Sequence, residues 1–326
     1  MKILITGASG FAGGVLAKKL IEQGHNIRVI VRDKSKLKLP NASNMEVFEG
    51  DIVDAKAVDN VVKGVEKVFH IAGLFRQAGI ADQVYWDINV GGTENLLNSS
   101  LRFGVKKFVH CSTVGVHGHI EDPPADETYR FAPGDIYQVT KLEGEKKAIK
   151  FYKETGLPIS VIRPGPIYGP GDLRLLKLFK LASRNITPIL GKGNIYFNMV
   201  YVDDLADAFI LASEKKGAIG EVFIAGGPEN ITLNEIVDLI AEIMGKPKTK
   251  IHIPAKPFQI LGLICEKICI PLGIEPPIYR RRVDFFTKSR AFDISKARKI
   301  LNYQPKVSIY EGLSRTVNWY SQQGLI

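Results

Sequence analysis

Short apolar runs alternate with amphipathic stretches along the N-terminal part of the chain. The first run, Lys2 to Ile5, has no polar alternation after Lys2, which is typical of a strand buried on both faces of a parallel sheet. The stretches between the runs repeat apolar residues at helical spacing. This alternation indicates βαβ crossovers and predicts an α/β fold with a doubly wound parallel sheet and helices on both faces. The expected strands cover 2–5, 26–31, 65–71 and 105–110, and the expected helices cover 15–24, 58–62 and 82–103.

A glycine-rich turn follows the first expected strand. Its glycines are spaced three residues apart, and a helical segment begins directly after them. Glycine is needed where the backbone turns tightly and approaches a pyrophosphate without a Cβ in the way, while the helix N-terminus supplies amides and positive potential. A tight turn without a ligand is the less favoured alternative, because this turn opens a βαβ unit. We therefore predict a dinucleotide site in a Rossmann-type sheet, lined by Gly7, Ser9, Gly10, Phe11 and Gly13.

The length of 326 residues exceeds the usual size of a single domain. We expect a Rossmann domain over residues 1–165, with returning elements at about 190–220. A smaller C-terminal substrate-binding lobe would consist mainly of residues 166–189 and 221–326.

The cysteines indicate a reducing environment. Cys111, Cys265 and Cys269 form an odd, sparse set without a CxxC pattern, so we expect no disulfide framework and no metal site. Cys265 and Cys269 lie one helical turn apart, which predicts two core thiols on one apolar face. A strand already starts at residue 2, which argues against a signal peptide and favours a cytoplasmic location.

The net charge of +10 is partly concentrated after the second expected strand, where Arg32, Lys34, Lys36 and Lys38 follow one another. The end of that strand faces the adenosine ribose in a Rossmann unit, where an acidic residue accepts the 2′-hydroxyls and an arginine accommodates a 2′-phosphate. Arg32 precedes Asp33, so we favour NADP over NAD as cofactor. If Asp33 turns inward, the preference is reversed. Because a cofactor phosphate would explain this basic cluster, we expect no nucleic acid partner.

A tyrosine and a lysine four residues apart, Tyr137 and Lys141, would share one face of a helix. A fixed ammonium favours the phenolate form of a nearby phenol, so the pair could exchange a proton with an alcohol or ketone. Ser112 and Thr113 follow the strand expected at 105–110, where ligands bind in open α/β sheets. A hydroxyl there could hold a substrate oxygen against Tyr137. Both motifs are weak alone, and their order after the glycine turn favours the catalytic interpretation.

Taken together, these motifs resemble the extended short-chain dehydrogenases/reductases, the NAD(P)-dependent epimerase/dehydratase superfamily. The resemblance covers nearly the whole chain and includes the runs at 6–13, 87–93, 163–171 and 201–206. It implies that Tyr137 is the general acid/base, that Lys141 lowers its pKa and holds the nicotinamide ribose, and that Thr113 positions the substrate oxygen, with Ser112 as the neighbouring hydroxyl. Further cofactor contacts implied by the resemblance are Asp51, Ile52, Ala72, Gly73, Tyr137, Lys141, Pro164, Gly165 and Ile167.

Departures from the family pattern narrow the chemistry. Dehydratases of this type place an Asp-Glu pair where Val114 and Gly115 stand, and elimination of water needs that second acid/base. Nucleotide-sugar epimerases usually have Asn at Pro166 and arginines near Phe197 and Phe286 for a diphosphate, which apolar residues replace here. We expect hydride transfer at a secondary alcohol or ketone of an apolar small molecule. A UDP-glucose 4-epimerase-like activity and a non-catalytic NADP-binding sensor or assembly protein are the alternatives.

The segment at 254–283 is rich in apolar residues and is followed by basic ones. Glu266 and Lys267 interrupt it, so it is too short to span a membrane. It could be a lid over an apolar pocket, an interfacial helix giving peripheral membrane contact, or a core helix. With the tail at 290–297, it resembles most the 3β-hydroxysteroid dehydrogenase and dihydroflavonol reductase branch. The resemblance also implies a homodimer formed through the helices at 82–103 and 137–155.

Overall fold

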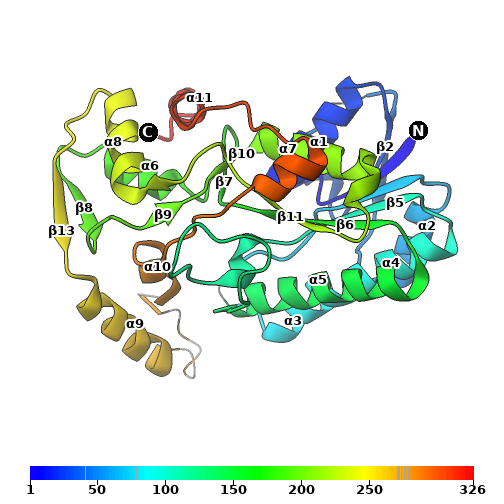
Figure 1. Cartoon of the computed structure of the whole chain (residues 1–326), viewed down its shortest axis with the longest axis horizontal. Helices are drawn as coiled ribbons and strands as arrows, with labels where there is room; N and C mark the ends of the chain where they lie inside the picture. The colour runs from blue at the N-terminus through cyan, green and yellow to red at the C-terminus, as the bar shows by residue number, and fades with distance from the viewer. Residues whose placement is uncertain (41, 78, 270–271, 273, 275, 278–279) are drawn as a thin grey trace.

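A seven-stranded parallel sheet forms the centre of the computed structural model (Figure 1). The structure describes residues 1–326 except 41, 78, 270–271, 273, 275 and 278–279. The strand order is β11-β6-β5-β4-β1-β2-β3, which confirms the predicted doubly wound sheet. The strands of this sheet are β1 (Lys2–Thr6), β2 (Asn26–Val31), β3 (Met45–Glu49), β4 (Lys67–His70), β5 (Lys107–Cys111), β6 (Ile159–Pro164) and β11 (Val222–Ala225).

Helices cover both faces of this sheet (Figure 1). Buried apolar residues of α1 (Phe11–Glu22) and α7 (Val202–Glu214) pack on one face. Those of α2 (Ala55–Val62), α4 (Gly92–Arg102) and α5 (Ile136–Thr155) pack on the other. Because β1 pairs with β2 on one side and β4 on the other, the strand order reverses beside β1. Such a reversal opens a crevice at the carboxyl ends of the strands, which is where ligands bind in open α/β sheets.

A second apolar cluster lies among the elements that follow β6. Its members come mainly from short strands and from three helices, and Figure 1 shows these elements beside the main sheet. The chain returns to the main sheet through α7 and β11, and the proposed division into two lobes stays a prediction. The remaining strands are β7 (Ile167–Tyr168), β8 (Thr187–Leu190), β9 (Tyr196–Phe197), β10 (Val200–Tyr201), β12 (Ile231–Thr232) and β13 (Lys250–Ile253), and the helices are α6 (Leu176–Ala182), α8 (Leu233–Ile243) and α11 (Ile309–Gln322).

The helix expected at 82–103 is interrupted by a π-helical turn. It consists of α3 (Asp82–Trp86), the turn η2 (Asp87–Gly91) and α4. Asn89 lies in this turn and is buried, and its side-chain oxygen accepts a hydrogen bond from the backbone amide of Leu74 at 2.7 Å. Single π turns often occur at functional sites. Here the turn brings an amide side chain from the helix to the loop after β4.

The helix α9 (Ala255–Cys269) is not a core helix. Of its residues only Gly262 is buried, whereas Ile260 and Ile268 are 60% and 56% exposed. Cys265 and Cys269 are half-buried, so the prediction of two core thiols was wrong. The apolar spacing predicts this helix correctly, but the apolar side chains that it carries point largely to solvent. No helix among the described residues is long and apolar enough to cross a membrane. The last helix of this region is α10 (Arg280–Phe285).

Candidate active site

The glycine turn between β1 and α1 leaves no room for side chains. Gly7 has a φ of +78°, and a Cβ on it would lie 2.7 Å from the Ala72 nitrogen. A Cβ on Gly13 would lie 2.2 Å from the Gly7 carbonyl oxygen. Gly10 is the N-cap of α1 and offers no side-chain cap, so the first amides of this helix are open to an anion. Ser9 and Gly10 are exposed, and the turn therefore fits the pyrophosphate of a dinucleotide.

The loop after β4 connects this turn to helix α5. The backbone amide of Ala72 donates to the Thr6 hydroxyl at 3.1 Å. A Cβ on Gly73 would lie 3.1 Å from Asn89 Oδ1 and 3.6 Å from Lys141 Nζ, so the Lys141 ammonium lies against the Gly73 backbone. The structure thus brings the predicted residues Ala72, Gly73 and Lys141 to one place at the carboxyl edge of the sheet.

The turn that follows β5 packs against helix α5 at this edge. Thr113 follows β5 and Tyr137 lies in the first turn of α5, and an interaction with the Thr113 side chain is a lesser influence that lowers the pKa of Tyr137. Burial has the larger effect and raises the pKa of Tyr137 to about 12. The direction is opposite to that expected from Lys141 alone. Ser112 is buried, and its hydroxyl has no hydrogen-bond partner among the described residues.

Lys141 lies among buried polar groups. It is 3% exposed, and burial lowers the pKa of its ammonium. His70 bridges Thr6 and Thr93 through its ring nitrogens at 2.8 and 2.9 Å. Burial, followed by the charge of Lys141, lowers the pKa of His70 to about 3. The imidazole is therefore neutral, and the only positive charge in this group is carried by Lys141.

An arginine that was not predicted from the sequence lies next to Tyr137. The guanidinium carbon of Arg76 is 5.3 Å from the centre of the Tyr137 ring, and Arg76 forms an ion pair with Asp135 at 2.5 Å. The Phe75 ring packs edge-on against Tyr137 at 5.0 Å. Against the larger effect of burial, the charges of Arg76 and Arg174 both lower the pKa of Tyr137. In the sequence, only the position of Arg76 shortly after the Ala72-Gly73 pair could have indicated that it belongs to the site.

Two further arginines approach the same region. Arg174 is ion-paired with the buried Asp172 at 2.6 Å and lies over Phe11 in the glycine turn, at 5.4 Å. Arg290 lies over Phe197, 5.7 Å from its ring centre. The diphosphate-binding arginines of nucleotide-sugar epimerases are expected near Phe197 and Phe286, where this chain has apolar residues. The structure places a guanidinium over Phe197 from a different position in the chain.

At the adenosine end of the predicted cofactor site, Arg32 is free to meet a ligand, whereas Asp33 caps its own turn. Arg32 is exposed at the end of β2. The Asp33 carboxylate accepts hydrogen bonds from the amide and hydroxyl of Ser35 at 2.9 and 2.6 Å, and so caps the short 3₁₀ helix Lys34–Lys36. The other predicted contacts lie in or directly after strands. They are Asp51 and Ile52 after β3, Pro164 at the end of β6, Gly165 after it, and Ile167 in β7.

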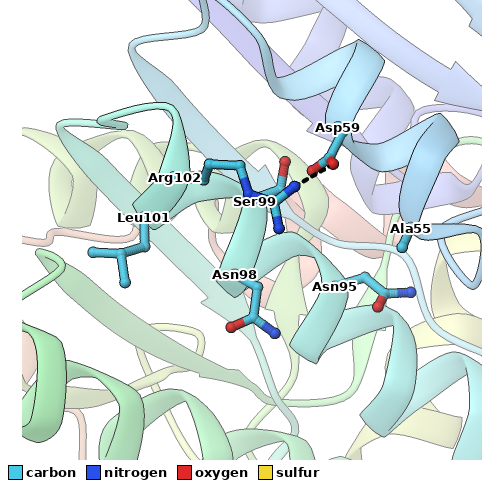
Figure 2. Close-up of a pocket in the computed structure, with 7 residues that line it drawn as sticks. All are labelled: Ala55, Asp59, Asn95, Asn98, Ser99, Leu101 and Arg102. Carbon is cyan, nitrogen blue, oxygen red and sulfur yellow. Dashed lines mark hydrogen bonds and ion pairs between the residues drawn. The ribbon is translucent and has the colours of Figure 1, made fainter.

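A hollow of about 360 Å³ lies elsewhere, between α2 and α4 (Figure 2). An ion pair between Arg102 and Asp59 spans it. No residue of the predicted site lines this hollow, and its lining is Ala55, Asp59, Asn95, Asn98, Ser99, Leu101 and Arg102.

The fold and the glycine turn define a dinucleotide-dependent enzyme. Residues 3–226 match the model of the NAD dependent epimerase/dehydratase family, so the chain belongs to this family of NAD-dependent dehydrogenases, reductases and epimerases. The chain is 30% identical to the 2-alkyl-3-oxoalkanoate reductase of Stenotrophomonas maltophilia, over 97% of this chain and 98% of the relative. It is 29% identical to the 3 beta-hydroxysteroid dehydrogenase/Delta 5-->4-isomerase of Mycobacterium tuberculosis, over 98% and 90%.

A solved structure of the family is similar over nearly the whole chain. The UDP-glucose 4-epimerase of Thermotoga maritima, solved with UDP-glucose, has a TM-score of 0.78 and 28% identity, with 99% of both chains covered. These comparisons confirm the predicted family and fold. They also agree with the main prediction from the sequence, which is an NAD(P)-dependent oxidoreductase of the extended short-chain type.

Proposed function

We propose that this protein exchanges hydride between a nicotinamide cofactor and a secondary alcohol or ketone of an apolar substrate, with Tyr137 as the general acid/base. The observation that carries the proposal is the position of the buried Lys141 ammonium, which lies against the Gly73 backbone one helical turn after Tyr137, in the loop that meets the glycine turn at Ala72. The names of the two relatives agree with it, since a 3-oxoalkanoate carries a ketone and a hydroxysteroid a secondary alcohol.

Each residue has a defined task in this proposal. The bound cofactor supplies the hydride acceptor or donor. Thr113 holds the substrate oxygen, and Tyr137 accepts or donates the proton at that oxygen. Lys141 holds the nicotinamide ribose, and the buried Ser112 hydroxyl, which has no hydrogen-bond partner among the described residues, is the second hydroxyl that can hold the substrate oxygen. Phe75 gives the substrate an apolar wall beside Tyr137.

The test follows nicotinamide absorbance during turnover of a panel of apolar ketones and secondary alcohols. We expect a net change in absorbance with wild-type protein, and a loss of about 10²–10⁴-fold in kcat with Tyr137→Phe. Cofactor affinity of this variant should stay within a few-fold, which serves as the control. A Tyr137→Phe enzyme with near wild-type turnover would remove this residue from the mechanism.

The second candidate is a nucleotide-sugar epimerase, favoured by the similarity to the Thermotoga maritima epimerase and by the guanidinium of Arg290 over Phe197. An epimerase restores its cofactor in each cycle, so product forms without a net absorbance change. Binding of cofactor with no turnover of any kind would favour a sensor or assembly protein. The panel therefore includes UDP-glucose, and product is measured separately from absorbance.

NADP is the proposed cofactor, with NAD as the alternative. Asp33 is engaged in capping its own turn, while Arg32 is exposed and has no ion pair to any described carboxylate. An exposed guanidinium at the end of β2 suits a 2′-phosphate.

A homodimer through α3, α4 and α5 is also proposed. Val84, Trp86 and Leu101 are 38%, 37% and 44% exposed on α3 and α4, and these helices lie next to α5 on one face of the sheet (Figure 1). Large apolar side chains on one exposed surface favour burial against a second copy. Light scattering at micromolar concentration should give twice the chain mass of 36.1 kDa, and a species at the chain mass alone would contradict the dimer.

Helix α9 is proposed to touch a membrane surface from the cytoplasmic side. Its exposed side chains are largely apolar, and lysines flank them at both ends of the helix. Apolar residues with a basic edge suit an interfacial helix. Sedimentation with vesicles containing anionic lipid should carry the protein down, and Ile260→Ser with Ile268→Ser should reduce the bound fraction. The side chains of Arg280, Arg281 and Arg282, the predicted basic edge, lie outside the described part of the structure.

A further inference from the structure

The guanidinium of Arg174 contacts two aromatic rings that belong to different parts of the crevice. Its central carbon is 5.4 Å from the centre of the Phe11 ring and 5.7 Å from the centre of the Phe75 ring. Phe11 is the first residue of α1 and belongs to the glycine turn, whereas Phe75 packs edge-on against Tyr137 at 5.0 Å. Arg174 therefore lies between the predicted pyrophosphate site and the tyrosine at the reacting end.

A buried carboxylate holds this guanidinium in place. Asp172 is 1% exposed, and one of its oxygens accepts hydrogen bonds from Arg174 Nε at 2.6 Å and from the Arg174 amide at 3.2 Å. Its other oxygen accepts from the Leu175 amide at 3.2 Å, and its backbone carbonyl accepts from the Tyr320 hydroxyl at 2.7 Å. Arg174 Nη2 donates to the Ile167 carbonyl at 3.1 Å. The arginine is thus fixed before a ligand arrives, which reduces the entropy lost on binding.

The outer edge of the same guanidinium stays open. Nε and Nη2 of Arg174 are engaged, but Nη1 donates no hydrogen bond to any described residue. The side chain is 40% exposed. Asp172 offsets the charge of Arg174, and the N–H groups left over can still form charge-assisted hydrogen bonds with an anion.

The position of Arg174 beside α1 indicates where such an anion would lie. A cation is unfavourable next to the positive end of a helix dipole, and an anion between the two removes the repulsion. Gly10 caps α1 without a side-chain hydrogen bond, so the first amides of the helix are open. The segment that carries Arg174 packs on this turn, because a Cβ on Gly171 would lie 3.4 Å from the Phe11 ring. Amides and a guanidinium from two separate segments can therefore bind one anion together.

We propose that Arg174 binds the pyrophosphate of the dinucleotide together with the glycine turn, and that it contacts the phosphate nearer to the nicotinamide. The contact with Phe75 sets the guanidinium on the side of Tyr137, where the nicotinamide lies during hydride exchange. The inference goes beyond the proposed function, because it requires the dinucleotide site but no particular substrate or reaction. It adds a cofactor contact from the segment after β7, which the glycine motif does not contain.

Calorimetric titration of the full chain with NADP, NAD, ADP-ribose and AMP tests the contact without turnover. The first three ligands share the pyrophosphate, whereas AMP has only the phosphate on the adenosine side. Arg174→Gln should weaken the three pyrophosphate ligands by about ten- to a hundredfold, the usual value of a hydrogen bond to a charged group, and should leave AMP binding within a few-fold. Arg174→Lys keeps the charge without the planar fork and should retain part of the affinity.

The matched control is Arg315→Gln. It removes another arginine that lies over an aromatic ring, Tyr201 at 5.6 Å, and that is ion-paired with a carboxylate, Glu311. It should leave all these affinities unchanged. Arg32→Ala gives a contrasting pattern, since it should weaken NADP alone. Far-UV circular dichroism verifies that each variant is folded, and if Arg174→Gln fails this check, the same comparison of ligands in Arg174→Lys decides the outcome.

Unchanged affinities in Arg174→Gln would overturn the proposal. An equal loss for AMP would mean that Arg174 only supports the turn, and a loss for NAD but not for ADP-ribose would assign the guanidinium to the nicotinamide; both results overturn it. UDP-glucose is titrated in parallel. Loss of its binding with unchanged cofactor affinities would assign Arg174 to a substrate diphosphate and also overturn the proposal.

The proposed function fails separately. If dinucleotide binding depends on Arg174 as expected but no ketone or alcohol is turned over, the catalytic assignment is wrong and the pyrophosphate contact stands. Turnover with net absorbance change in an Arg174→Gln enzyme of unchanged cofactor affinity gives the reverse result.

Discussion

Arg76 and Asp135 form an ion pair at the start of the helix that carries Tyr137. Asp135 is the N-cap of α5, because one of its oxygens accepts a hydrogen bond from the Gln138 amide at 2.9 Å. Its other oxygen is bonded to Arg76, 2.5 Å away. The cap that starts the helix therefore also fixes a guanidinium over the Tyr137 ring, so helix formation and the electrostatics of the phenol depend on one carboxylate.

The first prediction concerns the pH dependence of this phenol. A nearby positive charge favours the phenolate and lowers the pKa of Tyr137, so Arg76→Gln should raise that pKa. Alcohol oxidation requires the phenolate, and the alkaline rise of kcat/KM should therefore move to higher pH. Each unit of movement lowers the rate at neutral pH about tenfold. Arg130→Gln, which removes an arginine over Tyr129, is the control, and an unmoved profile in Arg76→Gln would contradict the prediction.

A second prediction tests the glycine turn. Gly13→Ala places a methyl group where the Gly7 carbonyl oxygen lies 2.2 Å away, so the turn must shift. Overpacking of this kind costs about 1–3 kcal/mol of folding stability. Cofactor affinity should fall more than stability alone explains, because the displaced amides are those that face the pyrophosphate. In Gly217→Ala the new methyl group would meet only a methyl group of the flexible Ile300 side chain, so cofactor affinity should not change. Equal effects of both variants on affinity would argue against a pyrophosphate site at the glycine turn.

The third prediction concerns cofactor choice. Arg32→Ala should weaken NADP binding by about ten- to a hundredfold and leave NAD almost unaffected, because only NADP carries the 2′-phosphate. The effect should shrink as salt is raised if Lys34 and Lys36 act through screened attraction. Equilibrium titration with both cofactors measures it. Tighter NAD than NADP binding by the wild-type protein would assign the ribose to Asp33 and leave the catalytic proposal intact.

Acid stability gives the fourth prediction. The pKa of His70 is lowered from 6.5 to about 3 by burial and then by Lys141. Between these values the unfolded chain binds one proton more than the folded protein, so the stabilisation is present above pH 6.5 and is lost as pH falls towards 3. His70 should contribute a slope of about 1.4 kcal/mol per pH unit. Urea titrations of His70→Gln should show this part of the slope removed, while the exposed His252→Gln keeps it.

The sequence predicted the sheet and the glycine turn because each depends on a short-range pattern, while the catalytic roles of Thr113 and Tyr137 stay predictions. Strand ends of a parallel sheet meet at one edge, so residues after β1, β4 and β5 had to converge. Arg290 could not be predicted in this way. It reaches the site through a bridge to Phe197, which lies far away in the chain, and the path between them depends on tertiary packing.

Helix α9 shows the opposite limit. Its apolar spacing predicts a helix correctly. The same spacing occurs on buried and on exposed helix faces, so it could not predict how far Cys265 and Cys269 are buried. The arginine next to Tyr137 was missed for a related reason. Its neighbours Leu74 and Phe75 indicate only a loop, and the direction of the Arg76 side chain is fixed by Asp135 from another element.

The π-helical turn at Asp87–Gly91 makes the length of this helix unusually sensitive to change. Successive residues of an α-helix differ by about 100° around its axis, so one extra residue in a turn resets which side chains face the sheet. Tyr85 before the turn and Leu96 after it are both buried under the present spacing. Deleting one residue between them would make the whole segment α-helical. It would also rotate the part before the turn relative to the part after it, so that the buried side chains of one part would turn away from the core. Natural variation in length should therefore accumulate in the connecting loops and be rare within this helix.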